Sequence, residues 1–367
     1  MANLCTHRLG RHKADFSISS GSLFNREPRP SAAVHRGGFK DVSVLMRIHV
    51  MRKLQCGFSL LETMAALAVI LVVSGIVMSG MIQMMNTQSK IANRTEMHAG
   101  VRSATELLQQ EIGQAGKVSL GDPTANVTLA SAVVVGTASF SLNTSAGVMP
   151  TVYPGEVLTV DVGANQEAVT VGGTSSAPTA PFTYAHPAGV AVSALGAFAT
   201  GIVPPAVAPA SYTNGSTGTV LKLYGDINSD GKMLYVEYTC SQGTSTAPGT
   251  LYRNQVSITA ASKPAVDNTM ILLNNVLTNP NDPSNNVVPC FSYQVQSLGS
   301  GYVVTDVAVT LTVQTQNVDP QTGAFQPETK ALLNVSPRNV FEVWDTARLV
   351  DPTRAQPIPA SVTNLLP

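Results

Sequence analysis

An uninterrupted apolar run near the N-terminus constrains this chain more than any other feature of its sequence. Residues 63–85 are 23 residues without a formal charge. As an α-helix they extend about 35 Å at ~1.5 Å per residue, which is enough to cross a hydrocarbon layer ~30 Å thick. The run therefore predicts one transmembrane helix. A cleaved secretory signal is the alternative, but its apolar core is usually about 7–15 residues long, and this run is longer and continues into a charged stretch.

Charge is distributed unevenly on the two sides of the apolar run. Residues 1–57 hold ten Lys/Arg and three Asp/Glu, whereas residues 58–367 hold twelve and nineteen. Because basic flanks stay on the cytoplasmic side, the imbalance predicts a cytoplasmic N-terminus and an exported remainder. Only 12% of residues are charged and 5% are aromatic, which is typical of a β-rich extracytoplasmic protein. The charge pattern does not indicate nucleic acid as a partner.

An amphipathic helical pattern follows the apolar run directly. Charged residues such as Arg94, Arg102 and Glu111 lie mostly off its apolar face, and Gly116 offers a stop. We expect a single helix over residues 58–116, transmembrane over about 63–85, whose second half packs on a domain. The apolar face comprises Met97, Val101, Ala104, Leu108, Ile112 and Ala115.

A short motif precedes the apolar run. Arg52 and Lys53 are followed by "GFSLLE", from Gly57 to Glu62. This pattern resembles the N-terminal signal of type IV pilins and type II secretion pseudopilins. The resemblance implies that prepilin peptidase, a membrane aspartic peptidase, cuts after Gly57 and methylates the new amine of Phe58. It also implies other major and minor pilins and an inner-membrane assembly platform as partners, and it makes Glu62 the family's characteristic carboxylate.

Glu62 directly precedes the apolar run. Burying an unpaired carboxylate in hydrocarbon there costs several kcal/mol of free energy. In an assembled filament it can meet the cationic amine of Phe58 on a neighbouring subunit, which would favour the correct axial register because a slipped subunit leaves both charges unpaired. The alternative is a carboxylate that is solvated at the headgroup boundary.

Residues 1–50 are basic and have no apolar periodicity. A start at Met51 gives the leader "MRKLQCG", a normal length for the family, so we expect the true start there; a genuine long leader is the alternative. The predicted organisation is a leader over residues 1–57, the helix over 58–116, a β module over 117–205, a sheet domain over 206–345 and a C-terminal tail over 346–367.

The exported part is predicted to be α+β, with the long helix packed on an antiparallel sheet and a small all-β module inserted between them. The runs "EVLTVDV" and "EAVTVGG" indicate strands of the module. The sheet domain resembles that of PilW-type minor pilins, whereas the module departs from that pattern. Its expected strands are "TVLKLYG", "MLYVEYTC", "TLYRN", "CFSYQV", "VTDVAVTLTVQT" and "ALLNVSPRN".

Cysteines and histidines are few after the leader. Cys240 and Cys290 remain, each at the edge of an expected strand, and an oxidising compartment favours a disulfide between them over two buried thiols. His98 and His186 are the only histidines of this part, and we expect His186 in a turn or on the surface. The mature chain has no Cys–His pairing, no metal-like His/Cys cluster and no Walker or Rossmann glycine pattern, so we expect no enzyme activity and no cofactor.

One segment matches a calcium-loop pattern. "DINSDGKMLYVE" places Asp226, Asn228 and Asp230 at loop spacing, with Glu237 at the closing position. The flanks alternate like strands, which puts Glu237 roughly 20 Å along a strand from the loop and out of reach at ~3.3 Å per residue. The open alternatives are calcium held by the first three residues, and an unliganded hairpin in which they only satisfy turn geometry.

The sequence predicts a minor type IV pilin, anchored in the inner membrane by one helix, with its C-terminal domain in the periplasm and on the pilus or cell surface after assembly. A type II secretion pseudopilin is the alternative within the family. An adhesion or binding protein that uses the pilin helix as an anchor, with the module as the binder, is the alternative of another class.

Overall fold

The computed structural model of the chain describes residues 59–120, 126–144, 152–299 and 301–367, without the side chains of residues 331–333. Gly57 and Phe58, the predicted cleavage and methylation residues, lie outside the described residues. Contacts divide the chain into a unit of residues 1–65 and a unit of residues 66–367. The fold class is α+β, as predicted from the sequence, with one long helix followed by antiparallel sheets.

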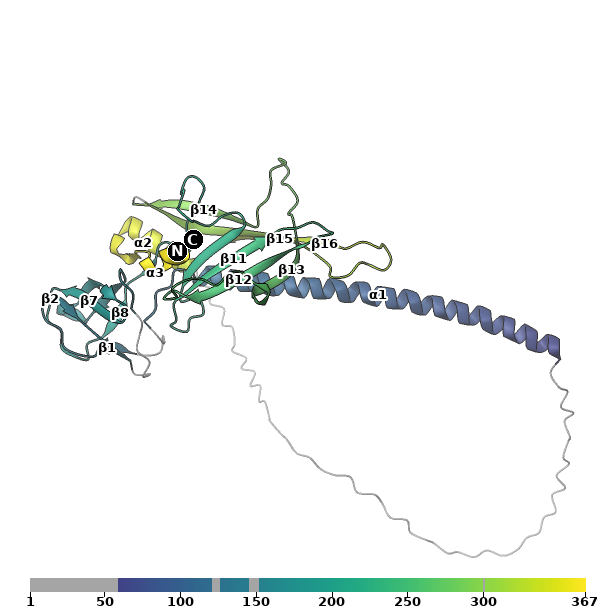
Figure 1. Cartoon of the computed structure of the whole chain (residues 1–367), viewed down its shortest axis with the longest axis horizontal. Helices are drawn as coiled ribbons and strands as arrows, with labels where there is room; N and C mark the ends of the chain where they lie inside the picture. Colours follow the sequence, from purple (N-terminus) through teal and green to yellow (C-terminus); the bar gives the residue numbers. More distant parts are fainter. Residues whose placement is uncertain (1–58, 121–125, 145–151, 300) are drawn as a thin grey trace, which may run out of the picture. The chain divides into compact units, whose positions relative to one another are not determined.

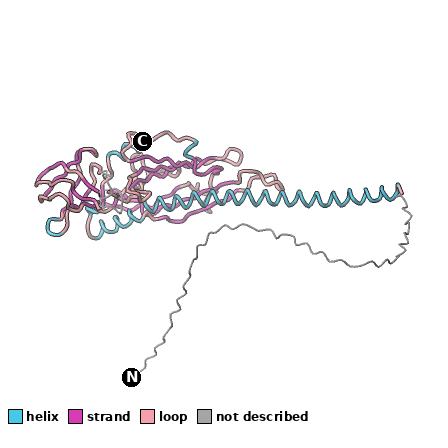
Figure 2. The backbone as a smooth tube through the Cα atoms, turned by 90° about the horizontal axis from the view of Figure 1, so that it is seen from below, coloured by secondary structure: helices cyan, strands magenta, loops and turns pink. Residues whose placement is uncertain are grey.

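The first element is the 55-residue helix α1, Leu60–Gln114. Figure 2 shows it as one uninterrupted helix. Its C-terminus is fixed by Gly116, which has a φ of 82°, a conformation that glycine adopts without a Cβ penalty. A Cβ at this position would lie 2.8 Å from the carbonyl oxygen of Phe198 and 2.9 Å from Cγ2 of Val340. The predicted helix stop is therefore confirmed, and close packing as well as backbone conformation requires glycine there.

A seven-stranded antiparallel sheet forms the largest layer of the protein (Figure 1). Its strand order is β10-β11-β12-β13-β15-β14, and β16 pairs with β15. In chain order the strands are β10 Val220–Gly225, β11 Leu234–Ser241, β12 Gly249–Ser257, β13 Ile271–Leu277, β14 Phe291–Leu298, β15 Gly301–Gln314 and β16 Pro327–Val335.

The second half of α1 packs on this sheet. The apolar face predicted from the sequence is buried there in full, in one hydrophobic cluster with side chains of the strands. On β11 the alternation expected from the sequence holds, because Val236, Tyr238 and Cys240 share that cluster whereas Tyr235 belongs to another. Burying the apolar stripe of the helix against the sheet stabilises the domain by removing apolar surface from water.

Short strands between α1 and β10 form the β module, which has a hydrophobic cluster of its own. They pair as β1-β3, as β2-β7-β6 and as β5-β4-β8, and β9 pairs in parallel with β17 near the C-terminus. The predicted module strands correspond to β4 and β5. The bounds are β1 Val127–Leu129, β2 Gly136–Ser139, β3 Leu142–Thr144, β4 Val157–Val160, β5 Glu167–Thr170, β6 Gly172–Thr174, β7 Ala177–Phe182, β8 Val192–Ala194, β9 Ala197–Phe198 and β17 Ala355–Gln356, with a 3-10 turn at Gly163–Asn165.

The C-terminal segment is built into the fold. Helix α2, Arg338–Leu349, spans the predicted boundary at residue 345, and helix α3, Ala360–Leu365, follows. Leu365 and Leu366 are buried in a cluster with Phe198 and Tyr224. The side chain of Gln356 accepts a hydrogen bond from the Val157 nitrogen (2.6 Å) and donates one to the Val157 carbonyl (2.9 Å). The last residues of the chain therefore connect the module to the sheet domain.

Two strand predictions differ from the structure. The strand β13 was not expected, because "MILLNNVL" reads as a short apolar run with two central asparagines, one of which, Asn275, has a φ of 60°. The segment "PRN" does not continue the last strand. Instead, β16 ends at Val335 and α2 begins at Arg338, since Pro337 cannot extend a ladder of hydrogen bonds and serves as the N-cap of the helix.

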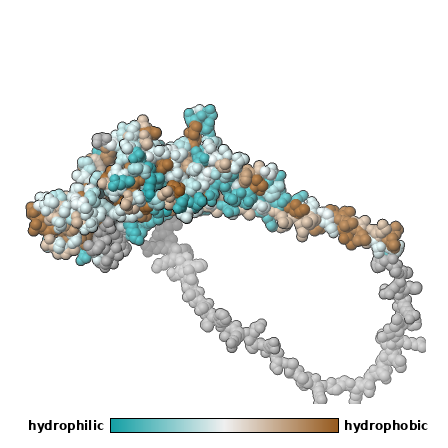
Figure 3. Space-filling model, in the orientation of Figure 1, coloured by the Kyte–Doolittle hydropathy of each residue, from teal (hydrophilic) through white to brown (hydrophobic). Residues whose placement is uncertain are grey.

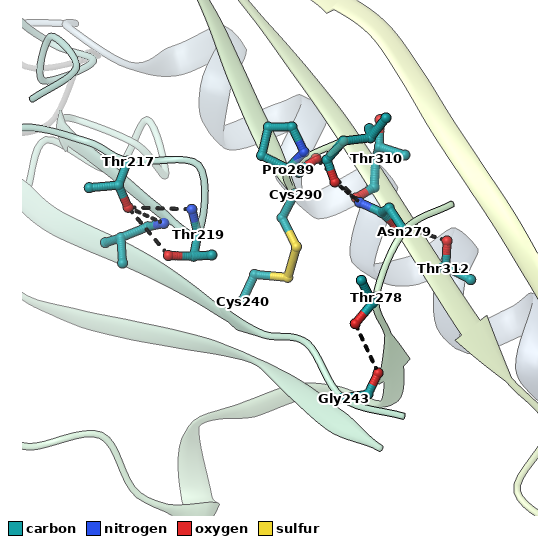
Figure 4. Close-up of a disulfide and its surroundings, with 12 residues drawn as sticks. Thr217, Thr219, Cys240, Gly243, Thr278, Asn279, Pro289, Cys290, Thr310 and Thr312 are labelled. Carbon is teal, nitrogen blue, oxygen red and sulfur yellow. Dashed lines mark hydrogen bonds between the residues drawn. A yellow bond between two sulfur atoms is a disulfide. The ribbon is translucent and has the colours of Figure 1, made fainter. Parts of the chain in front are cut away.

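The predicted disulfide joins Cys240, at the end of β11, to Cys290, just before β14, with Cα atoms 6.5 Å apart (Figure 4). Both residues are buried. Asn279 fixes the same region, because its side-chain nitrogen donates to the carbonyls of Pro289 (3.2 Å) and Thr310 (2.9 Å), while Thr312 donates to its oxygen (2.9 Å). The bridge thus connects strands that are not neighbours in the sheet.

Replacing both cysteines tests the contribution of this bridge. The double variant Cys240→Ser/Cys290→Ser should lose about 4 kcal/mol of unfolding free energy, because the bridge closes a 50-residue separation. Denaturant unfolding of the soluble part, residues 86–367, measures the loss. Treatment of the unmodified protein with reductant should give a similar loss and should leave the variant unchanged. Equal stability of variant and unmodified protein would contradict the structural role of the bridge.

Candidate functional site: the N-terminal helix and its contact with the sheet

The first half of α1 carries the candidate assembly surface. An 18-residue window of this helix has a mean hydropathy of 2.5 and is wholly unburied, and in the described part of the chain α1 alone is long and apolar enough to cross a membrane. Its apolar side chains stand out as brown patches in Figure 3. Leu60, Leu71 and Ile76 are 77%, 71% and 68% exposed. No protein layer covers this surface, so it needs lipid or other helices around it.

Glu62 lies in the first turn of α1. Ser59 begins the helix, because its hydroxyl accepts a hydrogen bond from the Leu61 nitrogen (3.3 Å) and its carbonyl accepts one from the Glu62 nitrogen (2.9 Å). A carboxylate in the first turn is favoured by the partial positive charge of a helix N-terminus. Within the described residues no side chain pairs with the Glu62 carboxylate, and the residue is exposed. Its geometry leaves the carboxylate accessible to another molecule.

The second half of α1 is held to the sheet by a buried ion pair. Glu111 is 2% exposed and accepts hydrogen bonds from Arg253 of β12, whose Nε lies 3.0 and 3.1 Å from the two carboxylate oxygens and whose Nη2 also bonds Oε1. The hydroxyl of Tyr238, on β11, donates to the same carboxylate. Burial lowers the pKa of Arg253, but the hydrogen bond and the negative charge of Glu111 outweigh burial and hold that pKa above its usual range. The guanidinium therefore stays charged.

Sequence reasoning missed this cluster. Glu111 was counted among the charges mostly outside the apolar face, although it directly precedes Ile112, which belongs to that face. Its partner Arg253 is 142 positions away, a separation at which only the folded sheet shows the pairing. A carboxylate at the border of an apolar stripe is the one sequence signal that was available.

One family model matches the chain: the prokaryotic N-terminal methylation motif, over residues 52–78. This range includes Gly57, Phe58 and Glu62 and ends within α1. The chain is a type IV pilin-like protein. No curated protein and no solved structure shows significant similarity to it. The motif implies processing by prepilin peptidase and assembly with other pilins, and the N-terminal apolar helix is consistent with membrane anchoring.

The candidate calcium residues of this pilin-like protein lie in the turn between β10 and β11. Asp226 is fully buried, and its Oδ1 accepts hydrogen bonds from the nitrogens of Asp230 (3.0 Å) and Gly231 (3.2 Å), while its Oδ2 lies 3.2 Å from Nζ of Lys117. Calcium would have to displace Lys117 from this carboxylate. Glu237 is bonded elsewhere, to Lys263 (2.7 Å) and to the hydroxyl of Tyr235 (2.7 Å). Calcium binding through Asp226, Asn228 and Asp230 stays a prediction.

The expectation for His186 was wrong. It is 1% exposed and lies in the module between two carboxylates, with Nδ1 3.0 Å from Asp161 and Nε2 2.8 Å from Glu167. Glu167 also accepts hydrogen bonds from the nitrogens of Thr183 and Tyr184. The flanking residues "AHPAG" have the composition of a surface turn. The two carboxylates lie elsewhere in the chain, Asp161 directly after β4 and Glu167 at the start of β5.

The buried histidine ties module stability to pH. Burial lowers the pKa of His186, but hydrogen bonds to Glu167 and Asp161 and their charges outweigh burial and raise it. Burial raises the pKa of Glu167, but its hydrogen bonds with His186 and with backbone nitrogens outweigh burial and lower this pKa. The pKa of Asp161 is lowered by a backbone hydrogen bond from Val162 and by the hydrogen bond with His186. The raised histidine pKa stabilises the module fully below about pH 6.5, its unfolded value, and this contribution disappears as pH rises through the folded value. The lowered pKa values of the two carboxylates also stabilise the module. This contribution is present above about pH 4.3 and is lost as pH falls through the folded pKa values.

The variant His186→Gln tests this linkage. We expect the stability difference between the unmodified protein and His186→Gln to be greatest near pH 6 and to shrink as pH rises. Burial raises the pKa of Glu156 to about 8. Its ionisation therefore destabilises both proteins increasingly from about pH 4.3 to about pH 8, and this contribution cancels in the difference. Chemical denaturation of residues 86–367 from pH 5 to pH 9 measures the difference in unfolding free energy between the two proteins. A pH-independent difference would contradict the buried imidazolium.

A double-mutant cycle tests the contact between α1 and the sheet. Glu111→Gln should destabilise the domain by about 2–3 kcal/mol, because it leaves the partly buried Arg253 guanidinium, 19% exposed, without its counter-charge. Adding Arg253→Met should recover part of the loss, with a coupling of about 1–3 kcal/mol. Glu106→Gln is the matched control, since its pairing with Arg102 is largely exposed and worth little. Additive losses in the cycle would show that the two groups do not act as a pair.

Proposed function

We propose that the chain is a minor type IV pilin that helps to initiate or decorate a pilus. The observation that carries the proposal is the methylation motif on a helix whose apolar half is uncovered and whose second half is fixed to a sheet. Such a helix supports packing among helices of other subunits, with the sheet at the outside. We propose an assembly role without catalysis and without a bound cofactor.

In this proposal the helix crosses the inner membrane once, and the sheet domain and the module are periplasmic before assembly. The assembly platform of the inner membrane extracts the processed subunit, and the domain reaches the pilus or cell surface. The excess of basic residues before the apolar run supports this orientation. Within the filament, Glu62 pairs with the Phe58 amine of a neighbouring subunit and sets the axial register.

A type II secretion pseudopilin would use the same helix and motif, and the position of the gene in a pilus or a secretion operon separates the two. The module favours a second role, because it has its own core and exposes large apolar side chains at Val134, Val135 and Val162. The pilin-anchored binding protein therefore remains the candidate of another class. Deletion of the module, with piliation and surface attachment scored separately, distinguishes it: loss of attachment alone would assign binding to the module.

Replacing Glu62 tests the assembly role. Glu62→Ala should be inserted and cut normally, because cleavage depends on Gly57, but its recovery in sheared filaments should fall at least tenfold. Immunoblots of membrane and filament fractions measure both quantities. Glu106→Ala, a glutamate substitution on the polar half of the same helix, should assemble like the unmodified protein. Normal incorporation of the Glu62→Ala protein into filaments would contradict the proposed charge pair between Glu62 and the Phe58 amine.

A further inference from the structure

The loop between β15 and β16 is tied to α1 close to the end of its apolar half. Asp319 Oδ2 lies 3.0 Å from Nζ of Lys90. About one turn further toward the C-terminus of α1, the side-chain nitrogen of Asn317 donates to the side-chain oxygen of Asn93 at 3.2 Å, and the Asn93 side chain donates to the Asn317 carbonyl. Figure 1 shows the loop beside α1, where β15 and β16 end. Two polar contacts from neighbouring turns of α1 thus fix the level of the loop along the helix.

The helix axis sets the height of these contacts above the apolar run. Lys90 follows Met85, the last residue of the run, by five positions, or about 7.5 Å, and Asn93 follows it by about 12 Å. The headgroup layer occupies roughly 5–8 Å on each side of the hydrocarbon. The part of the loop bonded to Lys90 therefore lies at the level of the headgroups.

The exposed surface of this loop is apolar and carries no exposed charge, as expected for a surface at the level of the headgroups. Val318 is 44% exposed and Phe325 36% exposed. Asp319 is the one charged residue between Thr315 and Gln326, and it is itself buried at 2% exposure.

The Asp319 carboxylate is also neutralised within the fold. It accepts hydrogen bonds from the Gln321 nitrogen (2.9 Å) and the Gln326 side chain in addition to the ion pair with Lys90. A backbone hydrogen bond and the contact with Lys90 hold its pKa below the usual range. The loop thus presents apolar and uncharged polar groups without an exposed charge.

We propose that the β15–β16 loop, residues 315–326, is a membrane-contact surface that rests on the headgroup layer on the exported side of the bilayer. Val318 and Phe325 enter the interface, where an apolar side chain on a polar, charge-free loop is favourable. Lys90 and Asn93 position the loop, because they bind it to the helix that crosses the same bilayer. The inference rests on α1 spanning the membrane and is independent of whether the chain serves a pilus or a secretion system.

The contact orients the sheet domain before extraction. A subunit held at the bilayer by its helix and also by this loop keeps β16 and the neighbouring face of α1 at a fixed height above the membrane. The loop must leave the headgroups when the subunit enters a filament. The surface is therefore a property of the membrane-resident subunit.

Tryptophan fluorescence in single-copy nanodiscs tests the proposal on the full chain. The only tryptophan, Trp344, is first replaced by Phe, and Phe325→Trp is then introduced. The nanodiscs contain phosphatidylethanolamine and phosphatidylglycerol, with or without a nitroxide-headgroup phosphatidylcholine as quencher. We expect at least twofold quenching of the new tryptophan. Adding Lys90→Ala, which removes the contact with Asp319, should reduce the quenching.

Phe341→Trp in the same background is the matched control. Phe341 is 43% exposed on α2, and α2 packs near Val303, at the other end of β15 from the loop. Eleven residues of strand separate Val303 from Gln314, or roughly 36 Å at ~3.3 Å per residue. This tryptophan should be quenched by less than a fifth.

Two results would overturn the proposal. The first is equal quenching of the Phe325→Trp and Phe341→Trp proteins, with circular dichroism showing both folded. The second is a loop tryptophan that stays unquenched in nanodiscs and becomes shielded only in filaments, which would assign the surface to a neighbouring subunit. Val318→Trp repeats the measurement at a second loop position, so the outcome does not depend on one substitution.

Discussion

The buried ion pair of Glu111 and Arg253 is the contact on which the position of the N-terminal helix depends. A carboxylate and a guanidinium that are removed from water must be paired in good geometry, and here two strands supply the donors, Arg253 and Tyr238. The apolar side chains along the same helix face drive burial, but apolar contacts tolerate sliding. The ion pair has one geometry, so it selects one register of α1 on the sheet.

This register matters because the same helix continues into its uncovered apolar half. α1 runs from Leu60 to Gln114 without a break, and a hydrogen-bonded helix has no flexible linker between its halves. The two halves have different surroundings within the described residues: the second half is covered by the sheet, and the first half is uncovered. One continuous helix therefore carries both the uncovered apolar half and the face that packs on the sheet.

The sequence was sufficient to predict a structural feature where the pattern that indicates it is local and periodic. The apolar run, the stripe from Met97 to Ala115, the stop at Gly116 and the alternation along β11 each follow from spacing that the chain itself carries. It was not sufficient where a contact joins distant positions. The pairing of Glu111 with Arg253 and the burial of His186 between carboxylates depend on strand order, and polar residues near turns read as exposed until that order is known.

The proposed assembly role depends on a mature N-terminus that is cut after Gly57 and methylated at Phe58, two residues before α1 begins. The most direct test is mass spectrometry of the N-terminal peptide of the full-length protein from cells with active prepilin peptidase. We expect a mature chain that begins at Phe58 with a methylated amine, and we expect this species to disappear when the peptidase is inactivated. A chain that begins at Met1 or Met51 in cells with active peptidase would contradict processing as a type IV pilin-like protein.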